Sequence, residues 1–103
     1  MLPEPPSVKA HRLLWSKLTD AQRRTFPRGY IDVTGSRGGK YRIYTKRLVM
    51  NIRDRRIFRR ARTYCVAPTR YQPGSDMLLS QKLLIEADED SFREIAVRSF
   101  FGW

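Results

Sequence analysis

The sequence of 103 residues suits one domain with one hydrophobic core, because a chain of this length is too short to bury two. Lysine and arginine supply 21 residues against 10 aspartates and glutamates, a net charge of +11. One cysteine and one histidine exclude an intrachain disulfide and a four-ligand zinc site built from Cys and His side chains. No apolar run approaches the roughly 20 residues that span a bilayer, so we predict no membrane partner.

The beginning of the chain and the single cysteine both bear on cellular location. The opening MLPEPPS has no basic region followed by an apolar core, so we expect no signal peptide. A chain without disulfides is typical of a reducing compartment. We therefore predict a cytoplasmic protein.

The predicted elements start after an extended, proline-rich arm over residues 1–6. Ser7 is a candidate N-cap for a helix whose face is formed by residues three and four apart, namely His11, Leu14, Trp15 and Leu18. Thr19 and Gln22 form a capping box, which predicts a second short helix. The helical region is expected to end at Pro27.

Three or four strands follow. Residues 30–34 (YIDVT) and 40–45 (KYRIYT) alternate in polarity, 48–52 (LVMNI) is a shorter run, and 62–67 (RTYCVA) is rich in strand-forming residues. The alternation predicts that one side of the first hairpin is formed by Ile31, Val33, Tyr41 and Ile43. The other side would carry Tyr30, Asp32, Arg42 and Tyr44.

The C-terminal part is predicted to be helical. MLLSQKLLIEA forms helix readily, starts near Ser75 or Asp76, and is expected to bury Leu79, Leu83 and Ala87. Ser91 and Glu94 form a second capping box, and the buried face would continue through Phe92, Ile95 and Ala96. The helix therefore either runs on to about residue 100 or breaks near residues 88–91. The tail SFFGW is expected to pack on the sheet rather than on a partner.

These elements together predict a single-domain α+β protein over residues 1–103. Its N-terminal helical segment precedes a three- to four-stranded antiparallel β-meander, and a long C-terminal helix packs on the sheet.

The glycine-rich stretch TGSRGGKYRIYT (34–45) raises the question of a phosphate-binding loop. The P-loop pattern is G-x-x-x-x-G-K-[ST], and alignment on its glycine-lysine pair puts Thr34 and Tyr41 at two chemically required positions. A structural β-hairpin explains the stretch better, with positive φ angles at Gly35, Gly38 and Gly39. Arg37 and Lys40 would then lie at its exposed tip.

The strongest functional signal is the concentration of positive charge in residues 37–62, which hold 11 basic residues and one acid. Arginine dominates, and its planar fork suits bidentate contacts with phosphates and stacking on bases. We predict non-catalytic binding of DNA or RNA, with little sequence specificity. The candidate residues are Arg37, Lys40, Arg42, Lys46, Arg47, Arg53, Arg55, Arg56, Arg59, Arg60 and Arg62.

Two alternatives to nucleic-acid binding stay open. The basic segment is also compatible with a solvated turn, or with an assembly or adaptor protein that contacts an acidic protein or the acidic residues 76–94 of a second copy. The tyrosines interleaved with the arginines offer rings for base stacking, although strand tyrosines usually serve sheet packing. They are Tyr30, Tyr41, Tyr44, Tyr64 and Tyr71.

We predict no enzymatic activity, no cofactor and no small-molecule substrate. His11 is expected to be a packed or partly exposed residue of the helix rather than a catalytic base, and Cys65 to be a buried, inert thiol in a strand. The acidic run 88–90 lacks the spaced ligands of a calcium loop, so it is interpreted as a solvated helix face.

A skeleton of short motifs accompanies these features. YIDVTGS at 30–36 is followed by YRI at 41–43, NI at 51–52, Tyr64-Cys65, and DMLLSQKLLIE at 76–86. In this pattern the chain resembles a group of short, uncharacterised bacterial and phage-encoded proteins, over roughly residues 12–97. The resemblance implies no activity, so the functional interpretation rests on the residues themselves.

Overall fold

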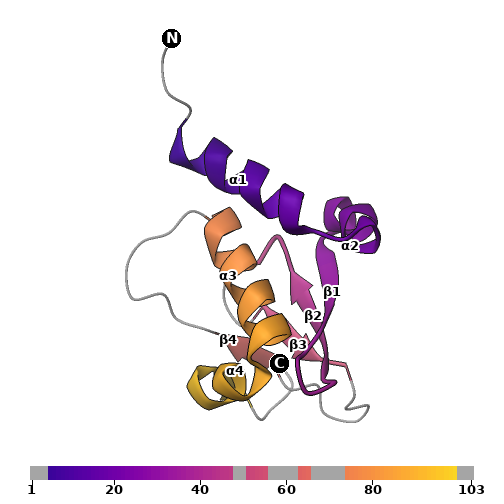
Figure 1. The fold of residues 1–103 in the computed structure, drawn as a ribbon, viewed down its shortest axis with the longest axis vertical. Helices are drawn as coiled ribbons and strands as arrows, with labels where there is room; N and C mark the ends of the chain where they lie inside the picture. Colours follow the sequence, from indigo (N-terminus) through magenta and orange to yellow (C-terminus); the bar gives the residue numbers. More distant parts are fainter. Residues whose placement is uncertain (1–4, 48–50, 56–62, 66–73, 100–103) are drawn as a thin grey trace.

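The computed structural model describes residues 5–47, 51–55, 63–65 and 74–99 and has the predicted α+β architecture (Figure 1). Five strands form one antiparallel sheet in the order β1-β2-β3-β4-β5, and helices α3 and α4 cover one of its faces. The strands are β1 (Tyr30–Thr34), β2 (Lys40–Tyr44), β3 (Ile52–Asp54), β4 (Thr63–Cys65) and β5 (Val97–Ser99). The helices are α1 (Pro6–Lys17), α2 (Asp20–Thr25), the 3₁₀ turn η1 (Phe26–Arg28), α3 (Gly74–Ala87) and α4 (Glu89–Ile95).

Helix α1 begins at Pro6 with Pro5 as its N-cap, so Ser7 is not the cap that the sequence suggested. Proline is well suited to the first helical position because it has no N–H that needs a partner there. Leu14 and Leu18 lie in the core as predicted, and α1 packs against α3. His11 and Trp15 lie on the exposed side of the helix instead, in contact with each other and with Phe26.

Helix α2 confirms the predicted capping box. The Gln22 backbone N–H donates to the Thr19 hydroxyl at 3.1 Å, and the Thr19 N–H donates to Oε1 of Gln22 at 3.0 Å. The side-chain nitrogen Nε2 of Gln22 donates to the backbone carbonyl of Asp32 at 2.9 Å. Since β1 is an edge strand, this contact covers part of an edge whose carbonyls would otherwise stay unpaired.

The predicted strands form, with one shift in position. Ile31 pairs with Ile43 across β1 and β2, and Ile43 pairs with Ile52 across β2 and β3. The third strand starts at Ile52, where the predicted run 48–52 ends, and residues 48–50 lie outside the described part of the chain. The β4 residues, Thr63–Cys65, fall within the predicted run 62–67.

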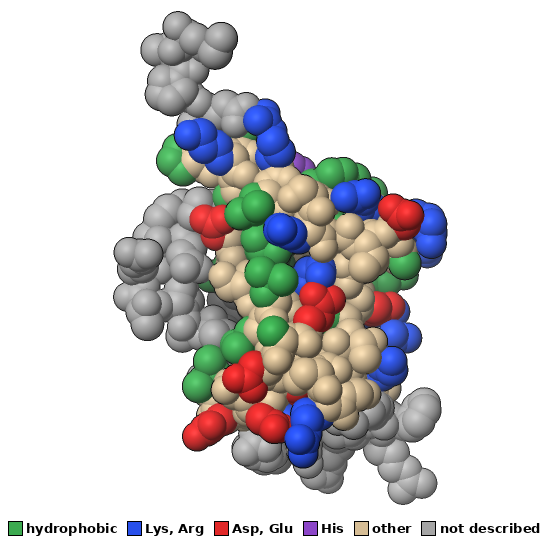
Figure 2. Space-filling model, viewed as in Figure 1, with side chains coloured by type: hydrophobic (Ala, Val, Ile, Leu, Met, Phe, Trp, Pro, Cys, Tyr) green, Lys and Arg blue, Asp and Glu red, His purple; other side chains and the backbone are tan. Residues whose placement is uncertain are grey.

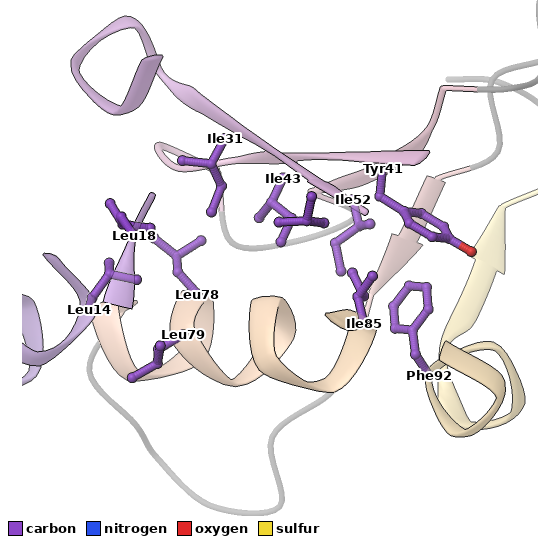
Figure 3. Packing of buried hydrophobic residues seen from close by; sticks show 11 residues of the cluster. Leu14, Leu18, Ile31, Tyr41, Ile43, Ile52, Leu78, Leu79, Ile85 and Phe92 are labelled. Carbon is purple, nitrogen blue, oxygen red and sulfur yellow. The ribbon is translucent and has the colours of Figure 1, made fainter. Parts of the chain in front are cut away.

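The core lies between the sheet and α3 and continues to α1 and α4 (Figure 3). On α3 the buried residues include Leu78 and Ile85, whereas Leu83 is 44% exposed and Ala87 is also exposed. The buried face of α3 is therefore rotated about the helix axis relative to the predicted one, and only Leu79 of the predicted set is buried. Leucines occur on every side of this helix, so apolar spacing alone does not select the face that packs on the sheet.

The C-terminal helix breaks at Asp88, which is one of the two outcomes that the sequence left open. Asp88 caps α4 by accepting hydrogen bonds from the backbone N–H and hydroxyl of Ser91, at 3.2 and 2.7 Å, and these bonds lower its pKa. The cap is therefore Asp88 rather than Ser91 with Glu94. The short α4 buries Phe92 but leaves Ile95 57% exposed, and the chain then adds β5 beside β4.

None of the helices in the described ranges is long and apolar enough to cross a membrane. The sequence predicts an extended arm over residues 1–6 and packing of the tail SFFGW on the sheet. Residues 1–4 of the arm and residues 100–103 of the tail lie outside the described residues.

A buried pair of amides joins the sheet to α3. Asn51 and Gln81 are 0% and 2% exposed, and each side chain both donates to and accepts from the other, at 2.8 and 3.1 Å. Asn51 also donates to the Tyr44 carbonyl at 3.4 Å. The pair lets a polar position of α3 face the core without leaving a buried group unpaired.

Replacing Gln81 with leucine should lower the free energy of unfolding by about 1–3 kcal/mol, because the Asn51 amide stays buried without its partner. The double variant Asn51→Leu/Gln81→Leu should lose less than the two single variants add up to. Urea denaturation measures both effects. Leu83→Gln, on the exposed side of the same helix, is the control and should be nearly neutral; a Gln81→Leu variant as stable as this control would contradict the role of the pair.

Candidate nucleic-acid interface

The face of the sheet turned away from α3 and α4 carries polar and aromatic side chains. Their strand neighbours point into the core, as the alternation predicted, and are Ile31, Val33, Tyr41, Ile43 and Ile52. The outward residues of β1, β2 and β3 are Tyr30, Asp32, Thr34, Lys40, Arg42, Tyr44 and Arg53. All of them are half-buried or exposed.

The strand register arranges these outward residues in rows across the sheet. Tyr30 is opposite Tyr44 in the first row, and Thr34 is opposite Lys40 in the third. The second row runs from β1 to β3 through Asp32, Arg42 and Arg53. Arg55 follows β3, and its backbone N–H donates to the Lys40 carbonyl at 2.8 Å. Four basic residues predicted to bind nucleic acid thus lie on one surface, which we call the basic sheet face: Lys40, Arg42, Arg53 and Arg55.

One carboxylate, that of Asp32, organises two of these arginines. Arg42 donates to it twice, from Nε at 2.9 Å and from Nη2 at 3.2 Å. Arg55 reaches the same carboxylate with Nη1 at 3.2 Å. The hydrogen bond to Asp32 raises the pKa of Arg42 above its ordinary value, against the opposing effect of burial. The arginine side chains are therefore held in place while their total charge exceeds that of the carboxylate they share.

Arg42 also stacks on an aromatic ring. Its guanidinium carbon lies 4.0 Å from the ring centroid of Tyr30, while its donors are directed at Asp32. This combination of a bidentate ion pair and a cation–π contact fixes the plane of the guanidinium. The Arg42 side chain stays 29% exposed.

The other predicted binding residues are distributed differently. Arg37 lies in the β1–β2 turn, where its largely exposed side chain is 3.7 Å from Asp90 of α4 rather than on the basic sheet face. Lys46 and Arg47 are exposed beyond the last residue of β2, at the opposite end of the strand from Lys40. The remaining candidates lie outside the described residues: Arg56, Arg59, Arg60 and Arg62.

The glycine turn between β1 and β2 does hold an anion, and that anion is the carboxylate of Glu89 in α4. The backbone N–H groups of Arg37 and Gly39 donate to Oε1 of Glu89 at 2.9 and 3.1 Å, and the Tyr41 hydroxyl donates to Oε2 at 2.5 Å. Arg93 adds a contact from Nε at 3.4 Å. Glu89 is 2% exposed, so the predicted solvated acidic face was wrong for this residue.

Two of the three turn positions require glycine for a reason other than the predicted positive φ. Within the turn only Gly38 has a positive φ, of 88°. At Gly35 and Gly39 a Cβ atom would collide with the carboxylate of Glu89, so these positions need glycine for space rather than for backbone conformation. The contact joins residues 50 positions apart, and no local sequence pattern indicates it.

Two physical effects oppose each other at Glu89. Burial raises its pKa, but the hydrogen bonds from Tyr41, Gly39, Arg37 and Arg93 outweigh burial, so the pKa lies below its ordinary value. The pKa of Tyr41 is raised, first by burial and then by its hydrogen bond to Glu89. Tyr41 therefore stays a neutral donor while Glu89 stays charged.

Ser36 and Arg93 extend the contact on either side of Glu89. The Ser36 hydroxyl accepts from the Glu89 N–H at 2.8 Å, and the Ser36 N–H donates to the carbonyl of Ile85 at 3.1 Å. The turn thus satisfies an end of α3 and an end of α4 at the point where the helices meet. Arg93 also bonds Asp54, which is 2% exposed, at 3.2 Å.

Comparisons of the chain with protein-family models, curated protein sequences and solved structures found no match. The resemblance to short bacterial and phage-encoded proteins therefore stays a prediction from the motif skeleton. Among the described residues, no group of three or more His, Cys, Asp and Glu side chains is placed to hold a metal ion.

Glu89→Gln should destabilise the protein at neutral pH by roughly 2–3 kcal/mol, because several hydrogen bonds to a buried charge are weakened. The folded-state pKa is lowered, so the unfolded chain takes up a proton first as the pH falls. The stabilisation by Glu89 is complete above its ordinary pKa of 4.5 and is lost as the pH falls through the folded-state value.

Urea denaturation at pH 7 and at acid pH measures the free energy of unfolding of the wild type and of Glu89→Gln. The difference between the two should become smaller at acid pH. Asp90→Asn is the matched control, because Asp90 is exposed and its loss should change stability by about 0–1 kcal/mol. A constant gap between the wild type and Glu89→Gln at every pH would show that shape rather than charge matters at this position.

Proposed function

We propose that the protein binds nucleic acid through the basic sheet face, without catalysis and with little sequence specificity. The observation that carries the proposal is the arrangement of Lys40, Arg42, Arg53 and Arg55 on one side of the sheet. Phosphates are recognised by such sets of cationic donors, and phosphate contacts position a protein on a nucleic acid without reading its sequence.

The charge balance of the basic sheet face supports the proposal. Among its described residues, four cations stand against the single carboxylate of Asp32, and that carboxylate is already shared by Arg42 and Arg55. Among the described contacts, the Lys40 ammonium group donates to a neutral partner, the Thr34 hydroxyl, at 3.1 Å. The face therefore keeps an excess of positive charge that an external polyanion can neutralise.

Assembly with another protein is the second candidate function. Val8 and Trp15 are exposed on one side of α1, at 45% and 38%, whereas Leu13, 48% exposed, lies on another side of the helix. The exposed apolar side of α1 suits a protein contact better than the acidic segment 76–94 does. Acidic side chains do gather around α4 on the helical side of the molecule (Figure 2). Several of those carboxylates already have partners within the chain, including Glu86 with Lys82, Glu89 with Arg93 and Asp90 with Arg37.

Binding to a random oligonucleotide should depend strongly on salt. If the basic sheet face neutralises about four phosphates, affinity should fall roughly 50- to 150-fold between about 50 and about 200 mM salt, because each contact releases condensed counterions. Fluorescence anisotropy of a labelled oligonucleotide measures this slope. Absence of binding at low salt, or affinity indifferent to salt, would reject the proposed function.

Removing two charges from the face should weaken binding more than removing two charges elsewhere. Lys40→Gln/Arg53→Gln should lower the affinity for all sequences about equally and halve the salt slope. Lys17→Gln/Arg24→Gln is the matched control, since both residues are exposed, belong to α1 and α2, and lower the net charge by the same amount. Equal loss in the two double variants would show that total charge, and not this face, attracts the oligonucleotide.

A further inference from the structure

The basic sheet face offers more than charge, because Arg42 has the geometry of a stacking platform. Asp32 occupies the Nε–Nη2 edge of its guanidinium, and the Tyr30 ring lies against one of its faces, 4.0 Å from the guanidinium carbon to the ring centroid. The Arg42 side chain is 29% exposed, and its planar guanidinium offers a flat surface for stacking. Tyr44 lies two residues further along the same strand and directly across from Tyr30.

The width of the sheet limits which kinds of nucleic acid can bring their bases into contact with Arg42. Five strands spaced about 4.8 Å apart span roughly 19 Å, whereas the major groove of a duplex is about 12 Å wide and admits a helix or a two-stranded ribbon. The β1 edge is also occupied, because Gln22 of α2 bonds the Asp32 carbonyl. The tip of the β1–β2 hairpin is held against α4 through Glu89. A duplex would therefore meet this face through its phosphates alone.

We propose that the ligand of the basic sheet face is a single-stranded nucleic acid whose bases stack on the Arg42 guanidinium and the Tyr44 ring. This inference rests on the proposed function and specifies its substrate class. Bases of a single strand can be turned outward onto aromatic rings and guanidinium planes, and such stacking tolerates any sequence because every base has a π face. Lys40, Arg53 and Arg55 would hold the phosphates of the same strand.

The direct test compares two labelled single strands of about 12 nucleotides that carry the same number of phosphates. One has a mixed sequence, and the other consists of abasic sites. Stacking of even one base should make the mixed strand bind about 10-fold more tightly at equal salt, as measured by anisotropy. Equal affinity for the two strands would overturn the inference and leave the charge-based function standing. Failure of both to bind at low salt would instead reject the proposed function.

Two variants test the platform itself. Arg42→Lys keeps the charge but removes the plane, and Tyr44→Leu keeps apolar bulk but removes the ring. Each should weaken binding of the mixed strand severalfold more than it weakens binding of the abasic strand or of a blunt duplex. Trp15→Leu is the matched control, because it removes an exposed aromatic residue of α1 and should change none of the three affinities.

The platform variants are informative only if they fold, which circular dichroism and thermal melting establish. If one of them unfolds, the other and the abasic comparison on the wild type still decide the question. An equal loss of affinity for all three ligands would assign Arg42 and Tyr44 to charge and packing, and the inference would then be wrong.

Discussion

A buried carboxylate is expensive unless its oxygen atoms find several donors, and that constraint shapes the end of this fold where Glu89 lies. Its donors come from the β1–β2 turn, from Tyr41 of β2 and from Arg93 of α4, so they assemble only when the hairpin and the helix are both in place. Arg93 then extends the arrangement to the buried Asp54 of β3. Loss of Glu89 would leave its buried donors without this acceptor, so we infer that this network makes the hairpin, β3 and α4 cooperate in folding.

The same contact determines which side of the sheet is open. With the turn attached to α4 and the apolar row of the hairpin packed on α3, the inward face is filled by Ile31, Ile43 and Ile52. The strands must then direct Lys40, Arg42 and Arg53 to the other side, because side chains alternate along a strand. The position of the basic residues on one surface is therefore a consequence of how the core is built.

The sequence predicts those features that depend on local chemistry. The alternation in residues 30–34 and 40–45 identifies both faces of the hairpin, and the Thr19–Gln22 capping box identifies the start of α2. It does not predict the roles of Gly35, Gly39 and Glu89, because a contact across 50 positions leaves no periodic trace. The buried face of α3 was missed for another reason. Gln81 faces the core because Asn51 supplies its partner, and hydrophobicity alone cannot anticipate that pairing.

The position of Asp32 explains how the cationic side chains of the basic sheet face are oriented. Exposed ion pairs contribute only about 0–1 kcal/mol to stability, so the partly exposed pair of Asp32 with Arg42 does little to hold the fold. Its effect is on orientation, because the fork of Asp32 and the ring of Tyr30 fix the guanidinium plane. An arginine oriented before its ligand arrives loses less conformational entropy on binding than a mobile one. One carboxylate among four cations can thus favour the binding of a polyanion by ordering the charges around it, even though it reduces their sum.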